Sequence, residues 1–192
     1  MKNEKGFSLV ELLIVIALVA IVATIALWGS QSVKGHRLTA ASKQLYGDLQ
    51  KVRVDAMTRS TANRGSRGFG IRLNSTTTYT IFEFQDDPTN TGVVAGTDNN
   101  FQDDGGAEES TTRTVSLPTG ITVTVDGDPP GDNNVVIFNK QGLAKASTWA
   151  GGGRTFIVQF SGVNQIRCVT LDDVRIREGV WNAASNPKCA IQ

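Results

Sequence analysis

The sequence predicts an α+β protein in which one long amino-terminal helix packs on a carboxyl-terminal antiparallel β domain, built as two sheets or as one curved sheet. Three observations support this class. Residues 7–28 form an apolar run that contains one charged side chain, Glu11. The segment after it repeats apolar residues every three or four positions, and beyond Arg67 the apolar repeat shortens to two. Helical periodicity followed by strand periodicity is the pattern of an α+β chain.

The apolar run is long enough to cross a lipid bilayer. Residues 12–23 are Leu, Ile, Val and Ala without interruption, and the 22 residues from 7 to 28 would form a helix about 33 Å long. Residues 24–35 offer no clean small-residue cleavage site of the kind that ends a secretory signal peptide. We therefore expect the run to stay in the protein as a membrane helix.

The helix is expected to continue past the apolar run as an amphipathic segment. Polar and charged side chains fill the positions between its apolar residues, so the apolar stripe is narrow. Gly29 and Gly35 weaken the helix locally, and its end is expected within residues 60–65. The stripe consists of Leu38, Ala41, Leu45, Leu49, Val52 and Ala56.

The remaining sequence predicts seven or eight short strands. Each predicted strand is bounded by Gly, Asn, Asp or Pro. The stretch ITVTV alternates most cleanly, with Ile121, Val123 and Val125 expected to point inward. The expected strands are residues 69–73, 77–84, 112–117, 121–125, 134–138, 154–160, 166–171 and 173–177.

Charge and cysteine content narrow the class of protein. The chain has 19 basic and 18 acidic side chains, so its overall charge does not indicate nucleic acid or an anionic surface as a partner. It has two cysteines, Cys168 and Cys189, which would form a disulfide in an exported domain and remain buried thiols in a cytosolic one. The membrane run favours export, and therefore the disulfide.

The sequence does not predict an enzyme, a cofactor or a catalytic residue. The single histidine, His36, lies on the helix far from both cysteines, and no phosphate-binding loop is present. Residues 98–104 and 126–134 are rich in oxygen ligands, yet neither has the spacing of a calcium loop, so we expect no metal. Residues 86–110, which are acidic and rich in Gly and Asn, are expected to form a long exposed loop.

The stretch KGFSLVELLIVIALV resembles the class III leader of type IV pilins and type II secretion pseudopilins. This resemblance implies that prepilin peptidase cuts between Gly6 and Phe7 and methylates the new amino group of Phe7. Glu11 then becomes the fifth residue, the position at which the family carries its assembly glutamate. The implied organisation is a leader at 1–6, a transmembrane and assembly helix at 7–29, an amphipathic continuation at 30–64 and a periplasmic β domain at 65–192.

The stretch RCVTLDDVRIREG resembles the closing hairpin of H-type pseudopilins and FimT-type minor pilins, in which Arg-x-Arg follows a glycine. Arg175 and Arg177 fit this pattern, whereas Val174 occupies the position of the glycine. In the FimT branch the strand contributes to DNA binding, and two arginines on one strand face would meet adjacent phosphates. Neighbouring acidic residues such as Asp172 favour the alternative, which is surface salt bridges.

Together these features predict a structural subunit, a minor pilin or pseudopilin of a type IV pilus or a type II secretion pseudopilus. It would cross the bacterial inner membrane once, with its β domain in the periplasm, before it enters the filament. The implied partners are other pilin subunits, prepilin peptidase and the inner-membrane assembly platform. The alternatives are a major pilin, a DNA-binding minor pilin for DNA uptake and, with no catalytic constellation to support it, a membrane-anchored hydrolase.

Overall fold

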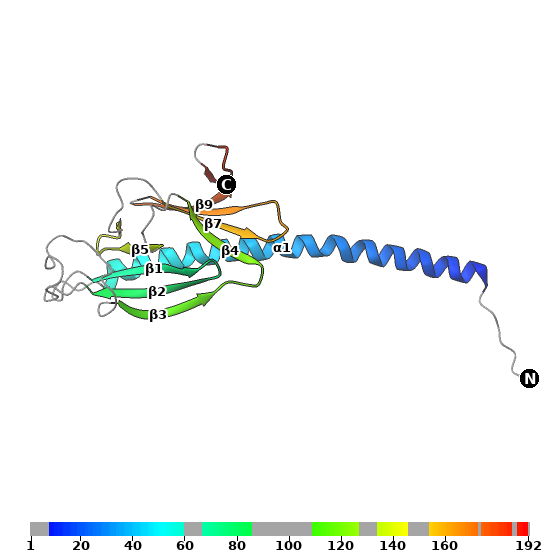
Figure 1. Cartoon of the computed structure of the whole chain (residues 1–192), viewed down its shortest axis with the longest axis horizontal. Coiled ribbons are helices and arrows are strands. Elements are labelled where there is room, and N and C mark those ends of the chain that lie inside the picture. The colour runs from blue at the N-terminus through cyan, green and yellow to red at the C-terminus, as the bar shows by residue number, and fades with distance from the viewer. Residues whose placement is uncertain are drawn as a thin grey trace, which may run out of the picture.

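The computed structural model describes residues 8–59, 67–85, 109–126, 134–145, 154–172, 174–185 and 188–191. In this part of the chain one long helix is followed by short strands, which confirms the predicted α+β class (Figure 1). The elements are α1 (Leu9–Arg59), β1 (Arg67–Ser75), β2 (Thr78–Gln85), β3 (Glu109–Ser116), β4 (Ile121–Asp126), β5 (Val135–Phe138), β6 (Ala144–Lys145), β7 (Arg154–Phe160), β8 (Arg167–Leu171), β9 (Ile176–Trp181) and β10 (Cys189–Ile191).

Helix α1 is continuous over 51 residues and ends at Arg59, one residue before the predicted range. It passes through Gly29 and Gly35 without a break, as predicted. Its carboxyl-terminal half lies against the strands, while its amino-terminal half projects away from them (Figure 1). One helix therefore belongs to two environments, a protein core at one end and open surroundings at the other.

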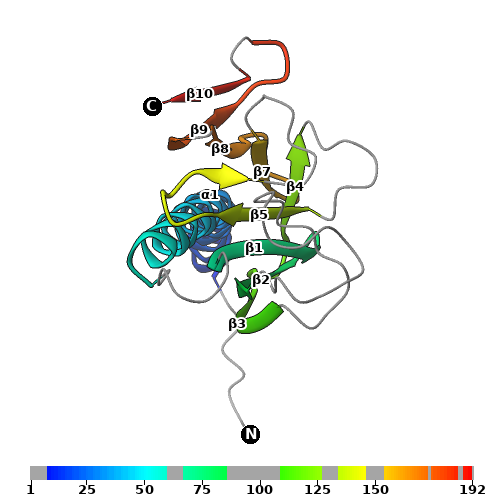
Figure 2. The ribbon, with the colours of Figure 1, turned by 90° about the vertical axis from the view of Figure 1, so that its left-hand side faces the viewer.

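The strands form two antiparallel sheets of five strands each, which settles the alternative between two sheets and one. The first sheet has the order β3-β2-β1-β5-β6, and the second has the order β10-β9-β8-β7-β4. In the view along the helix the two sheets lie at different levels beside α1 (Figure 2). Helix α1 contacts β1 and β5 of the first sheet and β7, β8 and β9 of the second.

The predicted stripe of α1 is the centre of the hydrophobic core. All six of its residues, from Leu38 to Ala56, are at most 2% exposed. They pack with apolar side chains from both sheets, including Ile71 of β1, Phe156 of β7 and Leu171 of β8. Burial of these side chains stabilises the domain by about 25 cal/mol per Å² of apolar surface removed from water.

A polar cluster fastens α1 to the outer strands of the first sheet. The hydroxyl group of Tyr79 on β2 donates a hydrogen bond of 2.6 Å to Asp48 of α1, and the guanidinium of Arg113 on β3 pairs with the other oxygen of the same carboxylate. Burial of the Tyr79 ring, together with the hydrogen bond to Asp48 and the charge of that carboxylate, raises the pKa of Tyr79 far above its usual value. The tyrosine therefore remains a hydrogen-bond donor throughout the physiological pH range.

The first sheet also buries apolar residues on a second face. Phe82, Val135 and Ile137 form a small cluster separate from the main core and are at most 8% exposed. Gly70 lies under this cluster, and a Cβ atom there would come within 2.7 Å of the Val136 carbonyl oxygen. The guanidinium of Arg72 stacks over the Phe82 ring, 5.3 Å from its centroid.

Seven of the eight predicted strands correspond to strands of the structure, namely β1 to β5, β7 and β8. Strand β4 alternates as expected at its start, with Ile121 and Val123 buried, whereas Val125 is only half-buried. Strands β6 and β10 were not predicted, because two or three residues cannot show a period of two. The predicted strand at 173–177 is displaced: only Ile176 and Arg177 lie in β9, and a turn closed by a hydrogen bond from the amide of Asp172 to the carbonyl of Arg175 precedes it.

Because the core is made by the stripe and the two sheets, a truncated chain that begins at Ser30 is expected to fold alone. It should be monomeric in detergent-free buffer and unfold in one cooperative thermal transition, since it keeps the core residues of α1 from Leu38 to Ala56. Circular dichroism and gel filtration check this. Aggregation with no cooperative transition, after expression under oxidising conditions, would contradict it.

The raised pKa of Tyr79 predicts a loss of stability in alkali. Above pH about 10 the unfolded tyrosine ionises while the folded one stays protonated, so the free energy of unfolding should fall by up to about 1.4 kcal/mol per pH unit. Below pH about 10 the full contribution of protonated Tyr79 to the free energy of unfolding is present. Urea unfolding at pH 9 to 11 of the wild type and of Tyr79→Phe tests it, because the variant should lack this slope. An equal fall of the unfolding free energy with pH in both proteins would refute the raised pKa of Tyr79.

Candidate functional site

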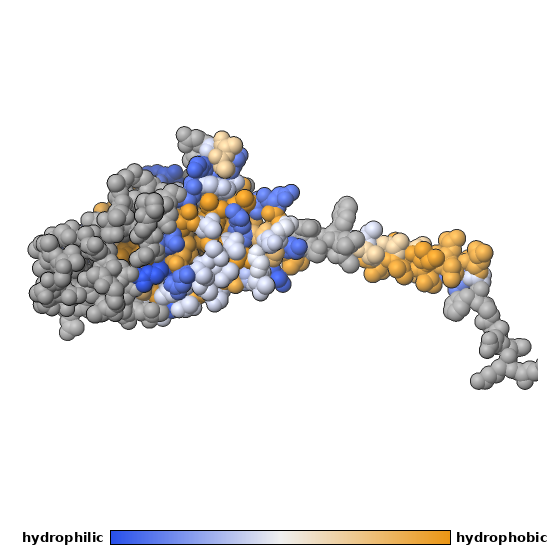
Figure 3. Space-filling model, viewed as in Figure 1, coloured by the Kyte–Doolittle hydropathy of each residue, from blue (hydrophilic) through white to orange (hydrophobic). Residues whose placement is uncertain are grey.

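The amino-terminal half of α1 is an apolar rod that no other described part of the chain covers. From Leu9 to Val22 its large apolar side chains are 51–80% exposed (Figure 3). Apolar residues occur around the whole circumference of the helix. They are Leu9, Val10, Leu12, Leu13, Ile14, Val15, Ile16, Leu18, Val19, Ile21 and Val22.

A helix that is apolar on every side is stable only where something other than water surrounds it, such as a bilayer or a bundle of other helices. An exposed apolar surface of this size is therefore an interaction surface. Within the residues that the structure describes, no helix meets both the length and the apolarity needed to cross a membrane.

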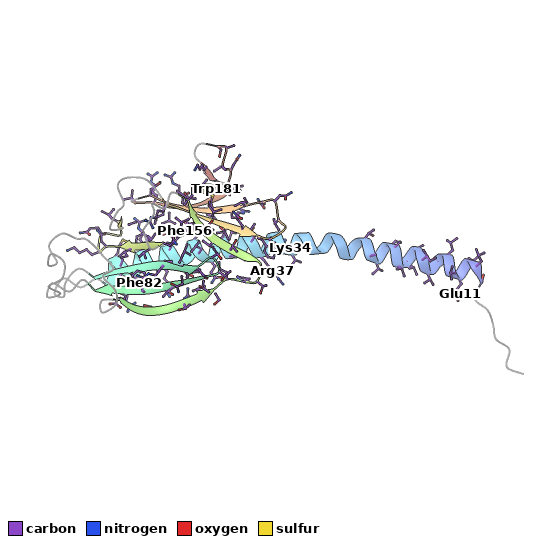
Figure 4. All side chains as sticks on the ribbon, in the orientation of Figure 1. Glu11, Lys34, Arg37, Phe82, Phe156 and Trp181 are labelled. Carbon is purple, nitrogen blue, oxygen red and sulfur yellow. A yellow bond between two sulfur atoms is a disulfide. The ribbon has the colours of Figure 1, made fainter. Side chains whose placement is uncertain are left out.

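Glu11 is the one charged residue of this rod. It lies in the first turn of α1, where the carbonyl group of Ser8 accepts a hydrogen bond from the amide of Leu12. Its side chain is exposed, at the far end of the helix from the β domain (Figure 4). A carboxylate here interacts favourably with the positive end of the helix dipole, by about 0.3–1 kcal/mol. The predicted processing residues, Gly6 and Phe7, lie outside the described residues.

The predicted disulfide is present: Cys168 of β8 is bonded to Cys189 of β10, with their Cα atoms 5.9 Å apart. Strand β9 lies between these two strands, and its Gly179 is paired with both Cys168 and Ile191. A Cβ atom at Gly179 would overlap the carbonyl group of Ala190. The missing side chain thus allows the last strand to lie close against the sheet, and the disulfide holds it there.

The two arginines that were predicted to share a strand face do not do so. Arg175 lies in the turn before β9 and is exposed, whereas Arg177 lies within β9. The guanidinium of Arg177 is 3.7 Å from the carboxylate of Asp172, which confirms the salt-bridge alternative for that arginine. Val174, the residue in place of the glycine expected there, is 52% exposed in the turn. A DNA contact by this pair stays a prediction.

A group of three side chains near the carboxyl terminus, Lys188, Asp126 and Trp181, was not predicted from the sequence. The ammonium group of Lys188 lies 3.1 Å from the carboxylate of Asp126, at the end of β4, and 5.7 Å from the centroid of the Trp181 ring. Strands β4 and β10 are the two edge strands of the second sheet. Lys188 directly precedes β10 and Asp126 is the last residue of β4, so their ion pair links the two edges. These residues are far apart in the sequence, and no local pattern marks the pairing.

The other candidate sites give no positive result. Most of the oxygen-rich stretches at 98–104 and 126–134, like most of the acidic segment at 86–110, lies outside the described residues. Among the residues that are described, no group of three or more His, Cys, Asp or Glu side chains is arranged to hold a metal ion. His36 is an exposed residue of α1.

Comparison with known proteins identifies the amino-terminal segment. Residues 1–27 match the family described as the prokaryotic N-terminal methylation motif. The matched region contains Gly6, Phe7 and Glu11, as well as all of the apolar rod from Leu9 to Val22. No match was found among curated proteins or among solved structures.

The disulfide is expected to carry much of the stability of the last strand. Cys168→Ser/Cys189→Ser opens a closed loop with a sequence separation of 21, and should lower the free energy of unfolding by about 3 kcal/mol. Urea unfolding measures this, with intact mass spectrometry under non-reducing conditions to verify the bond in the wild type. Two free thiols in the native protein, or an unchanged unfolding free energy in the variant, would contradict the prediction.

Proposed function

From the premise that the chain carries the methylation motif of the type IV pilin and pseudopilin family, we propose that it is a minor pilin or pseudopilin. It is a structural subunit of a type IV pilus or a type II secretion pseudopilus. The motif supports a pilin-like precursor that prepilin peptidase processes and that assembles with other pilin subunits. It points to a structural protein rather than to an enzyme.

The observation that carries the proposal is the uncovered apolar half of α1. The same helix buries its other half in the core of the β domain, so the rod is held at a fixed position by a folded body. In this proposal the bacterial inner membrane surrounds the rod first, with the β domain in the periplasm. The rods of neighbouring subunits then replace the lipid as the assembly platform inserts each subunit into the filament.

Processing supplies the partner that Glu11 needs. Cleavage between Gly6 and Phe7 removes the leader at 1–6 and frees the amine of Phe7, which is then methylated and stays cationic near neutral pH. An ionised carboxylate costs about 2.5–3.5 kcal/mol at the centre of a membrane helix on insertion scales, and less near its end, where Glu11 lies. A cation of opposite charge lowers this cost if it can approach the carboxylate closely.

The amine that pairs with Glu11 belongs to a neighbouring subunit. Glu11 is four positions after Phe7, so in one straight helix the two groups lie about 6 Å apart along the axis, at the same end, and pair poorly. A subunit that docks below another brings its Glu11 to the Phe7 amine of the subunit already in place. The pair neutralises two charges and sets the axial register, since a shifted register leaves both unpaired.

Replacement of Glu11 is expected to block assembly and to leave the earlier steps intact. In cells, Glu11→Leu and Glu11→Gln should still insert in the membrane and lose the leader. Their incorporation into filaments should fall at least about tenfold, because an unpaired buried amine costs several kcal/mol. Immunoblots of membrane and sheared-filament fractions measure both quantities.

Glu4→Gln provides the matched control, because it removes a carboxylate that lies in the leader and is absent from the mature subunit. It should assemble like the wild type. Wild-type assembly of Glu11→Leu would refute the pairing. Failure of every variant, the control included, to reach the membrane would refute the proposed insertion itself.

A further inference from the structure

The β domain has a distinct end that faces the amino-terminal half of α1. It consists of the β3–β4 turn (residues 117–120), the β7–β8 turn (residues 161–165) and the segment of α1 around Lys34 (Figures 1 and 4). The two turns adjoin, because the amide of Ser161 donates a hydrogen bond of 3.0 Å to the carbonyl of Gly120. A Cβ atom on Gly162 would lie 3.9 Å from the Lys34 ammonium nitrogen. We call this surface the helix-proximal end.

The charge of the helix-proximal end is positive and comes from α1. Its two turns contain no ionisable side chain, whereas Lys34 and Arg37 are one helical turn apart on one side of α1. Lys34 is half-buried and Arg37 is exposed. Among the described residues neither takes part in an ion pair. His36, between them in sequence, is about 100° from Arg37 and about 160° from Lys34 around the helix axis.

The position of these two cations along α1 matches the thickness of a membrane. Residues 12–33, which separate Glu11 from Lys34, contain no charged side chain. As a helix these 22 residues are about 33 Å long, close to the roughly 30 Å hydrocarbon core of a bilayer. If Glu11 lies near one boundary of the core, Lys34 and Arg37 reach the phosphate layer at the other.

We propose that the helix-proximal end docks on anionic phospholipid headgroups before assembly, with Lys34 and Arg37 bound to their phosphates. This inference rests on the proposed insertion of α1 in the membrane. Each cation near an anionic leaflet is worth about 1 kcal/mol, so the pair shifts the ratio of docked to undocked domain by about thirtyfold. The exposed side chains of Thr119, Ser161 and Asn164 add uncharged hydrogen-bonding groups to the same surface.

The docking has a consequence for the orientation of the subunit. Helix α1 crosses the membrane and holds the β domain at one fixed height, because the helix is continuous from the rod into the core. Two phosphate contacts close to the helix axis then hold the turns against the leaflet. A β domain so held waits for the filament at a defined height and tilt.

The test measures how close the β7–β8 turn lies to the headgroups. Full-length protein carrying Asn164→Cys, labelled with a fluorophore, is reconstituted in phosphatidylcholine vesicles with or without phosphatidylglycerol. A headgroup-attached nitroxide lipid quenches the label. Quenching should rise with phosphatidylglycerol, fall again in high salt, and lose this lipid dependence in Lys34→Gln/Arg37→Gln.

Lys43→Gln/Lys51→Gln is the matched control. It removes the same charge from α1, but at positions about 14 and 26 Å further from the membrane than Lys34, beyond a Debye length of about 8 Å. It should keep the lipid dependence of the wild type. An equal response from both double variants, or none to phosphatidylglycerol in an inserted protein, would overturn the docking alone. Failure of the wild type to float with either type of vesicle would overturn the membrane insertion too.

Discussion

Burial of one stripe of α1 between two sheets is the contact on which the whole molecule depends. It closes a core that neither sheet closes alone, because β1, β5, β7, β8 and β9 all contact the helix. It also fixes the direction and height of the other half of α1, which has no cover of its own. The polar link through Asp48 and the covalent link through Cys168 then secure the outer strands of each sheet.

The division of α1 explains how one helix could serve both folding and the proposed assembly. The stripe from Leu38 to Ala56 lies on one side of the helix only, so packing against the β domain is enough to remove its apolar side chains from water. The rod around Glu11 is apolar on all sides and requires a second environment. In the proposed function a lipid bilayer provides it first and a bundle of identical helices later. Both are apolar, so the proposed transfer requires little change in burial.

Patterns with a short period predicted most of this fold. The stripe and the longer strands repeat over enough residues to show their period, and Glu11 is evident as a lone charge in an apolar run. The pairing of Asp48 with Tyr79 and Arg113, and of Lys188 with Asp126, joins residues far apart in sequence, so no period indicates it. The alternation of VRIR placed the start of the last predicted strand where a turn lies, before Ile176, because a hairpin turn can carry the same residues as a strand end.

Hydrogen exchange of the full chain in lipid nanodiscs tests this division of α1 most directly. The account predicts two protected blocks in one helix: residues 38–56, held by the β domain, and residues 9–24, shielded by the bilayer. Protease treatment that destroys the β domain should remove the first protection and leave the second. Amides of residues 9–24 that exchange in the bilayer as fast as those of an isolated helix in water would contradict the account.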